Sequence, residues 1–276
     1  MNVRTDARPE ITAEEFAWLA RFLHGLTGID LKPGKEAMVM GRLDRRLRHH
    51  GHASYTEYFR RVSDGDPLET RLMVDLLTTN ETSFFREPAH FDFMDRWLAD
   101  LPRNQRVRVW SAASSSGEEI WTIAMTLAER LGTDGAWEIL GTDISSRVLE
   151  TARRALYPVE AADRIPKHLL RKYCLRGRDE YEGYLAISPE LTAHCEFRSA
   201  NLINLPDDLG SFDIVFLRNV MIYFNTDTKS ELVRRIETMI RPGGYLFVSH
   251  SESINGLGSS LRMVQPSVYR AVAGDG

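Results

Sequence analysis

The chain has 276 residues, of which 43% are hydrophobic and 27% are charged, and its formal net charge is −4. This composition is typical of a globular protein and excludes a mostly disordered chain or a long coiled coil. The balance of charge gives no general attraction to nucleic acid, and no apolar run approaches the ~20 residues of a membrane span. Two cysteines without a C-x-x-C pair argue against a disulfide scaffold or a zinc site. We therefore expect a soluble, cytoplasmic, monomeric protein that binds no metal and no nucleic acid and does not insert into a membrane.

Residues 1–75 carry the patterns of amphipathic helices. Capping boxes begin at Thr12 and at Ser54, each with a glutamate three residues later, and Asp66 followed by proline is typical of a helix start. A further apolar period of helical spacing begins near Lys35. We predict a small, all-helical N-terminal domain over these residues.

The second predicted helix concentrates positive charge in a domain whose acidic and basic residues are equally numerous. Its arginines are Arg42, Arg45, Arg46 and Arg48. Such a stripe is either a solvated face or a surface that docks on an acidic partner. We interpret it as a docking surface.

Residues 78–88, T-T-N-E-T-S-F-F-R-E-P, join the two parts of the chain. Threonine, asparagine and serine favour irregular backbone, whereas Phe84 and Phe85 require burial. We expect a polar segment that these two aromatic side chains hold in place, with Arg86 pointing into a site. A helix should follow from Pro88.

Residues 106–143 organise the second part of the chain. An apolar-alternating strand is followed by the small residues 111–117, by a helix that begins at Glu118, and by a strand that ends at Asp143. This order is that of the ligand-binding half of an open α/β sheet. There, an acid at the tip of the second strand accepts hydrogen bonds from a ribose.

The first turn of this unit indicates which kind of ligand it accepts. It lacks the G-x-G-x-x-G pattern, and Glu118 and Glu119 stand at the helix start, where a pyrophosphate requires bare N–H donors. Carboxylates there suit a cationic ligand such as a sulfonium or an amino group. An ordinary βαβ crossover with a polar turn is the alternative for this stretch taken alone.

The remaining sequence continues the alternation with one interruption. Residues 174–192 hold two glycines around a polar tip between short alternating runs, the pattern of an inserted β-hairpin. A buried strand over 212–217 is followed by a helix over 227–241 that we expect to stop at Pro-Gly-Gly. Residues 245–249 and 268–272 read as a final antiparallel pair.

Four stretches together resemble one known family: T-T-N-E-T-S-F-F-R-E, S-A-A-S-S-S-G-E-E, G-T-D-I-S, and F-L-R-N-V-M-I-Y-F with R-P-G-G-Y-L-F later. They are similar to the chemotaxis-receptor methyltransferases of the CheR type, which use S-adenosylmethionine to methylate glutamate side chains of chemoreceptors. The resemblance covers nearly the whole chain. One departure is Ile120-Trp121, where the family commonly has Pro-Tyr. We expect altered packing there and no lost chemistry.

The resemblance implies an α/β fold for residues 76–276. This is an open, mostly parallel sheet of the Rossmann-like S-adenosylmethionine methyltransferase type, with an antiparallel final strand and a small inserted β-hairpin subdomain near 174–192. The all-helical domain of residues 1–75 precedes it.

The resemblance also implies roles for individual residues. Cofactor contacts would come from Asn80, Thr82, Arg86 and Glu118 at the methionine part, Asp143 at the ribose, Asn201 and Leu202 at the adenine, and Arg218 and Asn219 beside them. Arg86 and Tyr223 would lie next to the reacting methyl group as the catalytic pair.

The implied partner is the cytoplasmic methylation region of chemoreceptors, which would meet the arginine stripe. In some family members a receptor C-terminal pentapeptide adds to the hairpin insertion, and we extend that expectation here. Two other functions remain open at this point. A nicotinamide-dependent dehydrogenase would require glycines in the first turn, and a module that senses the cofactor without catalysis would bind it and transfer nothing.

Overall fold

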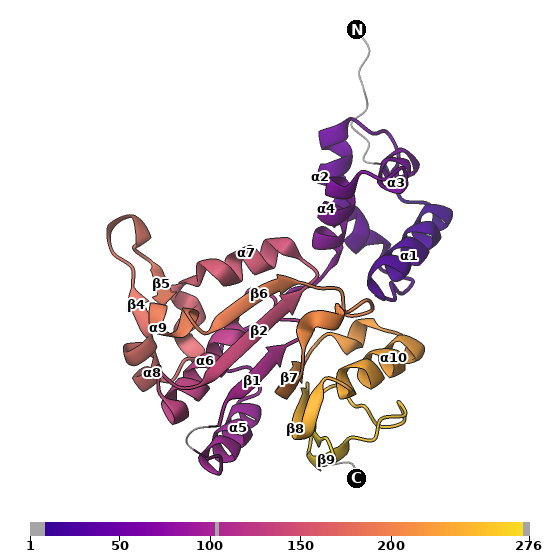
Figure 1. Cartoon of the computed structure of the whole chain (residues 1–276). Helices are drawn as coiled ribbons and strands as arrows, with labels where there is room; N and C mark the ends of the chain where they lie inside the picture. Colours follow the sequence, from indigo (N-terminus) through magenta and orange to yellow (C-terminus); the bar gives the residue numbers. More distant parts are fainter. Residues whose placement is uncertain (1–8, 103–104, 273–276) are drawn as a thin grey trace. The chain divides into compact units, whose positions relative to one another are not determined.

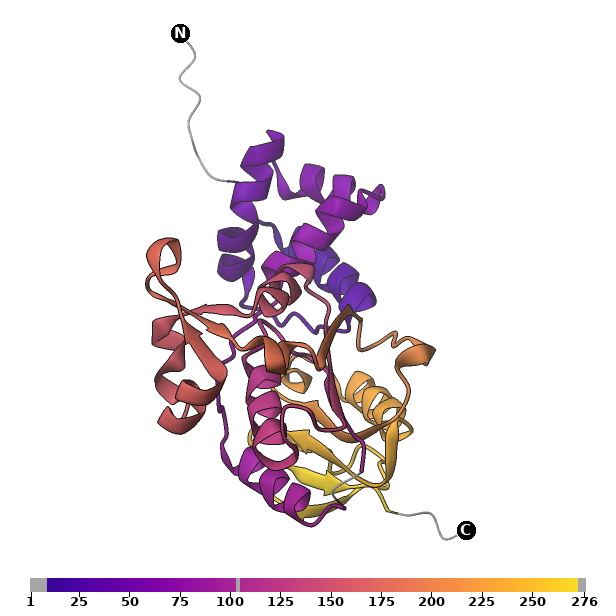
Figure 2. The same ribbon diagram turned by 60° about the vertical axis from the view of Figure 1, so that its left-hand side comes forward.

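The computed structural model describes residues 9–102 and 105–272. The contacts divide the chain into two compact units, one ending at Thr79 and the other beginning at Asn80. The sequence placed the boundary after residue 75, but the last helix of the first unit continues to Leu77. Among the described residues, no helix is both long enough and apolar enough to cross a membrane. Figures 1 and 2 show the elements of each unit from two sides.

The first unit is all-helical, as predicted. Its helices are α1 (Ala13–Thr27), α2 (Glu36–His50), α3 (Tyr55–Ser63) and α4 (Pro67–Leu77). The Thr12 capping box is formed in full, and Asp66 caps α4 through its side chain. Ser54 also caps α3, but the Glu57 carboxylate bonds the main-chain N–H of Ala53 at 2.8 Å. The predicted helix starts are therefore confirmed.

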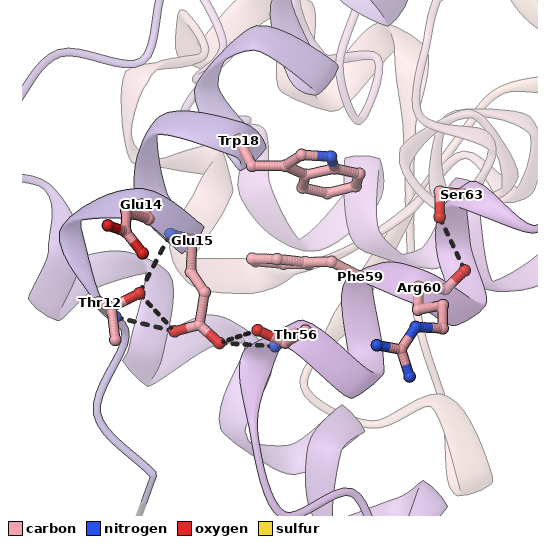
Figure 3. Close-up of a pocket in the computed structure, with 8 residues that line it drawn as sticks. All are labelled: Thr12, Glu14, Glu15, Trp18, Thr56, Phe59, Arg60 and Ser63. Atoms are coloured by element: carbon pink, nitrogen blue, oxygen red, sulfur yellow. Dashed lines mark hydrogen bonds between the residues drawn. The ribbon is translucent and has the colours of Figure 1, made fainter.

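Side chains of α1 and α3 line an open groove on the first unit (Figure 3). Trp18 stacks on Phe59 with a ring-centroid separation of 4.9 Å. At one end, the Glu15 carboxylate accepts hydrogen bonds from the main-chain N–H groups of Thr12 (2.8 Å) and Thr56 (2.6 Å). One glutamate therefore both caps α1 and ties it to the start of α3.

The second unit is built on a sheet whose described strands have the order β6-β2-β1-β7-β8-β10-β9. The strands are β1 (Val107–Ser111), β2 (Trp137–Asp143), β6 (Cys195–Ser199), β7 (Phe212–Leu217), β8 (Ile240–Val248), β9 (Arg262–Gln265) and β10 (Val268–Arg270). The first five strands in this order are parallel, and β10 and β9 are antiparallel to their neighbours. The predicted fold class is confirmed, and β9 is a strand that the sequence patterns did not predict.

Helices and short turns precede or connect the strands of this unit. They are α5 (Ala89–Ala99), α6 (Glu118–Leu131), α7 (Ser146–Arg154), α8 (Lys167–Tyr173), α9 (Pro189–Thr192) and α10 (Thr226–Glu237), with short 3₁₀ turns η1 (Val159–Arg164), η2 (Asp179–Tyr181), η3 (Asp207–Leu209) and η4 (Met221–Tyr223). α6 contacts β2, and α10 contacts β8. α6 is buried all round from Ile120 to Ala128, since the sheet, α5 and α9 all contact it.

The start of β8 differs from its prediction. We expected the preceding helix to run to Arg241 and to stop at Pro-Gly-Gly, but α10 ends at Glu237 and those residues lie inside β8. The register of β8 against β7 shifts at this point, and Gly243 has a φ of 80°. A Cβ on Gly244 would lie 2.6 Å from the Asp213 carbonyl oxygen. The glycines therefore allow an irregular strand here, whereas the Pro-Gly-Gly sequence had predicted the end of a helix.

The insertion forms a sheet of its own. The predicted hairpin is present as β4 (Cys174–Arg176) and β5 (Tyr184–Ile187), which pair antiparallel. β5 also pairs with β3 (Leu156–Pro158), a strand outside the predicted insertion, so the order is β3-β5-β4. Tyr157 of β3 donates a hydrogen bond of 2.6 Å to the Ser116 carbonyl, so this small sheet contacts the turn that follows β1.

Candidate functional site

The site lies at the carboxyl ends of β1 and β7. These neighbouring parallel strands are paired at Ser111 and Phe216, and the Ala112 N–H continues the ladder to the Phe216 carbonyl at 2.9 Å. From β1 the chain winds through β2 to β6, and from β7 it winds the other way to β8. In open α/β sheets, ligands bind in the crevice at such a reversal of strand order.

Asp143, the predicted ribose acid, holds the turn that follows β1. Its Oδ2 accepts from the main-chain N–H of Ser115 at 2.9 Å, and its Oδ1 accepts from that of Ser145 at 2.9 Å. The side chain is 8% exposed. A carboxylate offers about four lone-pair positions, so these two bonds are compatible with further hydrogen bonds to hydroxyl groups. The carboxylate therefore shapes the turn and lies at the tip of β2 as predicted.

Side chains of β3 and α6 pack against the same turn. The Tyr157 hydroxyl donates to the Ser116 carbonyl at 2.6 Å, and the Trp121 indole N–H donates to that hydroxyl at 2.6 Å. Gly117 has a φ of 98°, and a Cβ there would lie 2.8 Å from Ala152 and 2.9 Å from the tyrosine hydroxyl oxygen. Only glycine fits this position. Trp121, where the chain departs from the family's usual residues, thus acts in packing beneath the turn.

Glu118 opens α6 at the same edge. Its carboxylate accepts a hydrogen bond of 2.7 Å from the Ser116 hydroxyl, and burial raises the pKa of the carboxyl group above its usual range. A buried carboxylate is stabilised in its charged form by an adjacent cation. That a positively charged group of a ligand binds beside Glu118 stays a prediction from the sequence.

The segment from Asn80 to Pro88 is fastened across this edge. The Ser115 hydroxyl donates to the Asn80 carbonyl at 2.9 Å, and the Phe85 N–H donates to the Thr122 hydroxyl at 3.1 Å. Phe84 is fully buried, which confirms its prediction, and lies edge-on to Tyr157. Phe85 is only partly buried and has a positive φ of 49°. The two aromatic residues thus anchor the segment unequally.

Arg218, at the end of β7, links this segment to α6. Its side chain is 2% exposed, with Nη1 2.9 Å from the Glu119 carboxylate and Nη2 3.1 Å from that of Glu87. Nη2 also donates to the Arg86 carbonyl oxygen. The Arg86 side chain donates a hydrogen bond of 2.9 Å from Nη1 to the Glu81 carbonyl oxygen. Arg218 therefore fixes the main chain of the predicted catalytic arginine.

The remaining predicted cofactor residues lie on the same edge. Asn201 follows β6, where its Oδ1 accepts from the Ile203 N–H at 3.2 Å, and the preceding Ala200 N–H bonds the Asp143 carbonyl at 3.0 Å. Leu202 and Thr82 are partly buried. The structure thus brings the predicted residues of five separate segments to one edge of the sheet.

Asn219 and Tyr223 belong to the loop after β7. Asn219 has a φ of 59°, and Tyr223 is the last residue of η4. The loop is held by Glu252, which the sequence patterns did not single out. Its partners are backbone amides of a distant segment. Such a contact depends on no particular side chain of that segment, so no sequence pattern identifies this carboxylate.

The arginine stripe of α2 is divided between two environments. Arg42 donates to the carbonyl oxygens of Leu77 (2.9 Å) and Thr78 (3.0 Å) and so satisfies the end of α4. Arg46 forms a two-pronged ion pair with Glu69. Arg48 also lies 3.1 Å from the Asp44 carboxylate of the same helix. Three of the four arginines therefore form contacts inside their own unit, and the side chains of Arg45 and Arg48 are the exposed ones.

Glu69 is the centre of a polar cluster under that helix. Besides Arg46, it accepts from the Tyr58 hydroxyl at 2.9 Å and lies 2.9 Å from His50 Nε2. Burial opposes its ionisation, but the hydrogen bonds from Arg46, His50 and Tyr58 prevail and lower the pKa of Glu69 to about 2. The carboxylate is thus ionised at neutral pH and stabilises the unit.

One cluster of metal-type side chains occurs in the described part of the chain, where none was predicted. Atoms of Glu87, His90 and His250 lie within 4.8 Å of one another. His90 is fully buried, its Nε2 lies 2.7 Å from the Ser267 hydroxyl, and burial, with Arg218 and His250 nearby, lowers its pKa to about 3. Arg218 already supplies the positive charge beside Glu87, so we assign no metal here.

Comparison with known proteins agrees with this geometry. Residues 80–270 match the family described as CheR methyltransferase, SAM binding domain, and residues 14–78 match CheR methyltransferase, all-alpha domain. Chemotaxis protein methyltransferase 2 of Pseudomonas aeruginosa is 40% identical over 94% of this chain and 93% of its own length. The chemotaxis protein methyltransferases of Escherichia coli (37%) and Salmonella typhimurium (36%) each match 95% of the chain and cover 92% and 91% of their own lengths.

These matches span both units and the whole edge described above. They support neither a dehydrogenase nor a module without catalysis. The cofactor is S-adenosylmethionine. The chain belongs to the CheR family of S-adenosylmethionine-dependent methyltransferases of bacterial chemotaxis.

Proposed function

We propose that this protein transfers the methyl group of S-adenosylmethionine to glutamate side chains in the cytoplasmic methylation region of chemoreceptors, forming methyl esters. The observation that carries the proposal is the Arg218 contact to the Arg86 carbonyl, since it supports an arginine at the edge where the cofactor binds. An arginine there can receive an anionic acceptor. The relatives' names support the same class of receptor substrate.

The chemistry requires few protein groups. The bound cofactor supplies a methyl group activated by a positively charged sulfur. A glutamate carboxylate has a reference pKa of about 4.3, so it is an ionised nucleophile at neutral pH and needs no general base. One oxygen forms the new bond to carbon while the carbon–sulfur bond breaks, and the electron pair remains on sulfur. Opposite charges therefore disappear together, which a site that excludes water favours.

Arg86 and Tyr223 have the positioning roles in this proposal. The guanidinium would hold the acceptor carboxylate, ideally by a two-pronged contact, with one oxygen about 3 Å from the methyl carbon. The Tyr223 hydroxyl would donate a hydrogen bond to the same carboxylate. Asn80, Thr82, Asn201, Leu202 and Asn219 would complete the cofactor site.

A labelled-methyl assay with receptor-containing membranes tests this proposal. We expect base-labile label on receptors with the wild type, and about 100-fold slower labelling with Arg86→Ala, because the acceptor loses its orienting group. The matched control is Arg171→Ala, an exposed arginine of α8. Wild-type turnover in Arg86→Ala would remove its catalytic role, and cofactor binding without any transfer would contradict the proposed reaction.

The insertion supports a second, separate proposal about partners. β4 is an edge strand of the small sheet, and Leu175 on it is 55% exposed. An edge strand can accept an extended peptide as an added strand. We propose that a receptor C-terminal pentapeptide binds there to a monomeric enzyme. Peptide titration by calorimetry tests this, and no binding at high micromolar concentration would contradict it. Sedimentation would reveal any self-association.

A further inference from the structure

The carboxylate of Glu252 accepts hydrogen bonds from main-chain N–H groups of two different segments. Its Oε2 lies 2.9 Å from the Asn219 nitrogen and 3.0 Å from the Ser249 nitrogen. Its Oε1 lies 3.2 Å from the Ile222 nitrogen. Bonds from N–H groups to a charged carboxylate are stronger than those to a neutral acceptor.

These three amides come from the ends of neighbouring strands. Asn219 and Ile222 follow β7, and Ser249 follows β8, which pairs with β7 in parallel. Glu252 is further held by a turn in which its own N–H donates to the Ser249 carbonyl at 2.9 Å. The carboxylate is therefore fastened to the end of β8 and reaches across to the loop of β7.

The loop that it reaches contains Tyr223. Asn219 has a left-handed backbone, which is uncommon for residues other than glycine and which asparagine adopts more readily than most. Ile222 directly precedes Tyr223, whose own N–H bonds the Val220 carbonyl at 3.1 Å. At the far end the side chain of Phe224 is buried. The Glu252 bonds thus determine the path of the loop between β7 and the tyrosine.

We infer that Glu252 is a positioning residue for methyl transfer, which holds Tyr223 at the acceptor carboxylate through the backbone of residues 219–222. This rests on the role of Tyr223 in the proposed function. A glutamate is required because two oxygens must both accept. A glutamine would present its amide N–H₂ to one of the backbone donors, and an aspartate is shorter by one methylene group.

The test is a double-mutant cycle with Glu252→Gln and Tyr223→Phe, measured as receptor methylation. We expect Glu252→Gln to lower kcat about 10- to 100-fold, because a small misplacement of a reacting group has effects of that size. The KM for the cofactor should change by a smaller factor than kcat, because among the proposed cofactor residues only the backbone of Asn219 is bonded to Glu252. In the Tyr223→Phe background the same substitution should lower kcat less than about twofold, since the group it positions is gone.

The control is Glu231→Gln, an exposed glutamate of α10, which should behave as the wild type. If Glu252→Gln fails to fold, Glu252→Asp takes its place in the test. Its side chain keeps the charge but is shorter, so kcat should fall in the same way. An undiminished effect of Glu252→Gln in the Tyr223→Phe background would overturn the inference. So would wild-type turnover of Glu252→Gln or of Tyr223→Phe.

A structural readout separates this inference from the proposed reaction. In Glu252→Gln, amide hydrogen exchange over residues 218–224 should become faster, while α6 keeps its protection. Unchanged exchange in that loop would overturn the anchoring by Glu252 whatever the reaction is. Failure of the wild type to label receptors, with faster loop exchange in the variant, would instead contradict the proposed function and leave the anchoring supported.

Discussion

Arg218 and Glu119 form an ion pair of 2.9 Å in which the arginine side chain is 2% exposed. The pair joins the end of β7 to the first turn of α6, the two sides of the crevice at the reversal of strand order. Burying such charges costs solvation that only good geometry and further hydrogen bonds offset. Glu87 and the Arg86 carbonyl provide those further contacts. The arrangement thus links stability to the placement of Arg86.

We predict that Arg218→Met destabilises the protein by about 3–5 kcal/mol, because it leaves two carboxylates of low exposure without their cation. The measurement is urea denaturation. Arg218→Lys keeps the charge but cannot bridge both acids and the carbonyl group, so it should unfold at higher urea than Arg218→Met and still lose turnover. Arg171→Met serves as the control, and equal midpoints for Arg218→Met and the control would contradict the prediction.

The ribose assignment predicts a loss of cofactor affinity on changing Asp143. Asp143→Ala removes the acceptor for a ribose and also for two N–H groups of the site. We expect affinity for S-adenosylhomocysteine, measured by calorimetry, to fall at least about 10-fold, the equivalent of 1.4 kcal/mol. Asp134→Ala, at an exposed position after α6, is the control. Unchanged affinity in Asp143→Ala would count against the assignment.

The raised pKa of Glu118 predicts a pH-dependent affinity for S-adenosylhomocysteine, whose amino group is positively charged. Burial disfavours the ionised carboxylate, so protonation begins at a higher pH than the ~4.3 of an ordinary glutamate. Affinity should therefore fall as the pH is lowered into that range. Glu118→Gln should bind more weakly at neutral pH and show a flatter profile. Parallel profiles for the variant and the wild type would exclude this role.

Glu69 predicts a loss of stability in acid. Its pKa is lowered to about 2 in the folded protein, so the stabilisation is fully present above the unfolded pKa and is lost as pH falls through the folded pKa. The difference from about 4.3 corresponds to about 3 kcal/mol. Denaturation followed at pH 7 and near pH 2 should show a smaller loss for Glu69→Gln than for the wild type. Equal losses in both proteins would contradict the prediction.

The division of the arginine stripe predicts two different phenotypes. Arg46→Ala leaves Glu69 without its ion pair and should destabilise the protein by about 3 kcal/mol. Changing Arg45 and Arg48 to alanine together should alter stability by less than about 1 kcal/mol, because both are exposed and the Arg48–Asp44 pair lies within one helix. The same double variant should raise the KM for receptor, most clearly at low salt. An unaltered KM would exclude this surface from docking.

Local chemistry in the sequence was enough to predict many elements. Thr12 and Asp66 cap the helices that they were expected to cap, and the small residues before Glu118 form the turn between β1 and α6. The order of strand, turn, helix and terminal acid was sufficient to predict an open α/β sheet and the position of Asp143 at the end of β2. These features depend on residues within a few positions of one another, so they can be recognised along the chain.

The tertiary structure alone decided which polar side chains are free to act on other molecules. Arg46 and Arg45 are neighbours in sequence, yet only Arg46 meets an acid, 23 residues further along. Glu252 serves an amide 33 residues away, and nothing in its own segment indicates that. Such pairings arise only when packing brings distant segments together, because a hydrogen bond depends on distance and direction in space and not on position in the sequence.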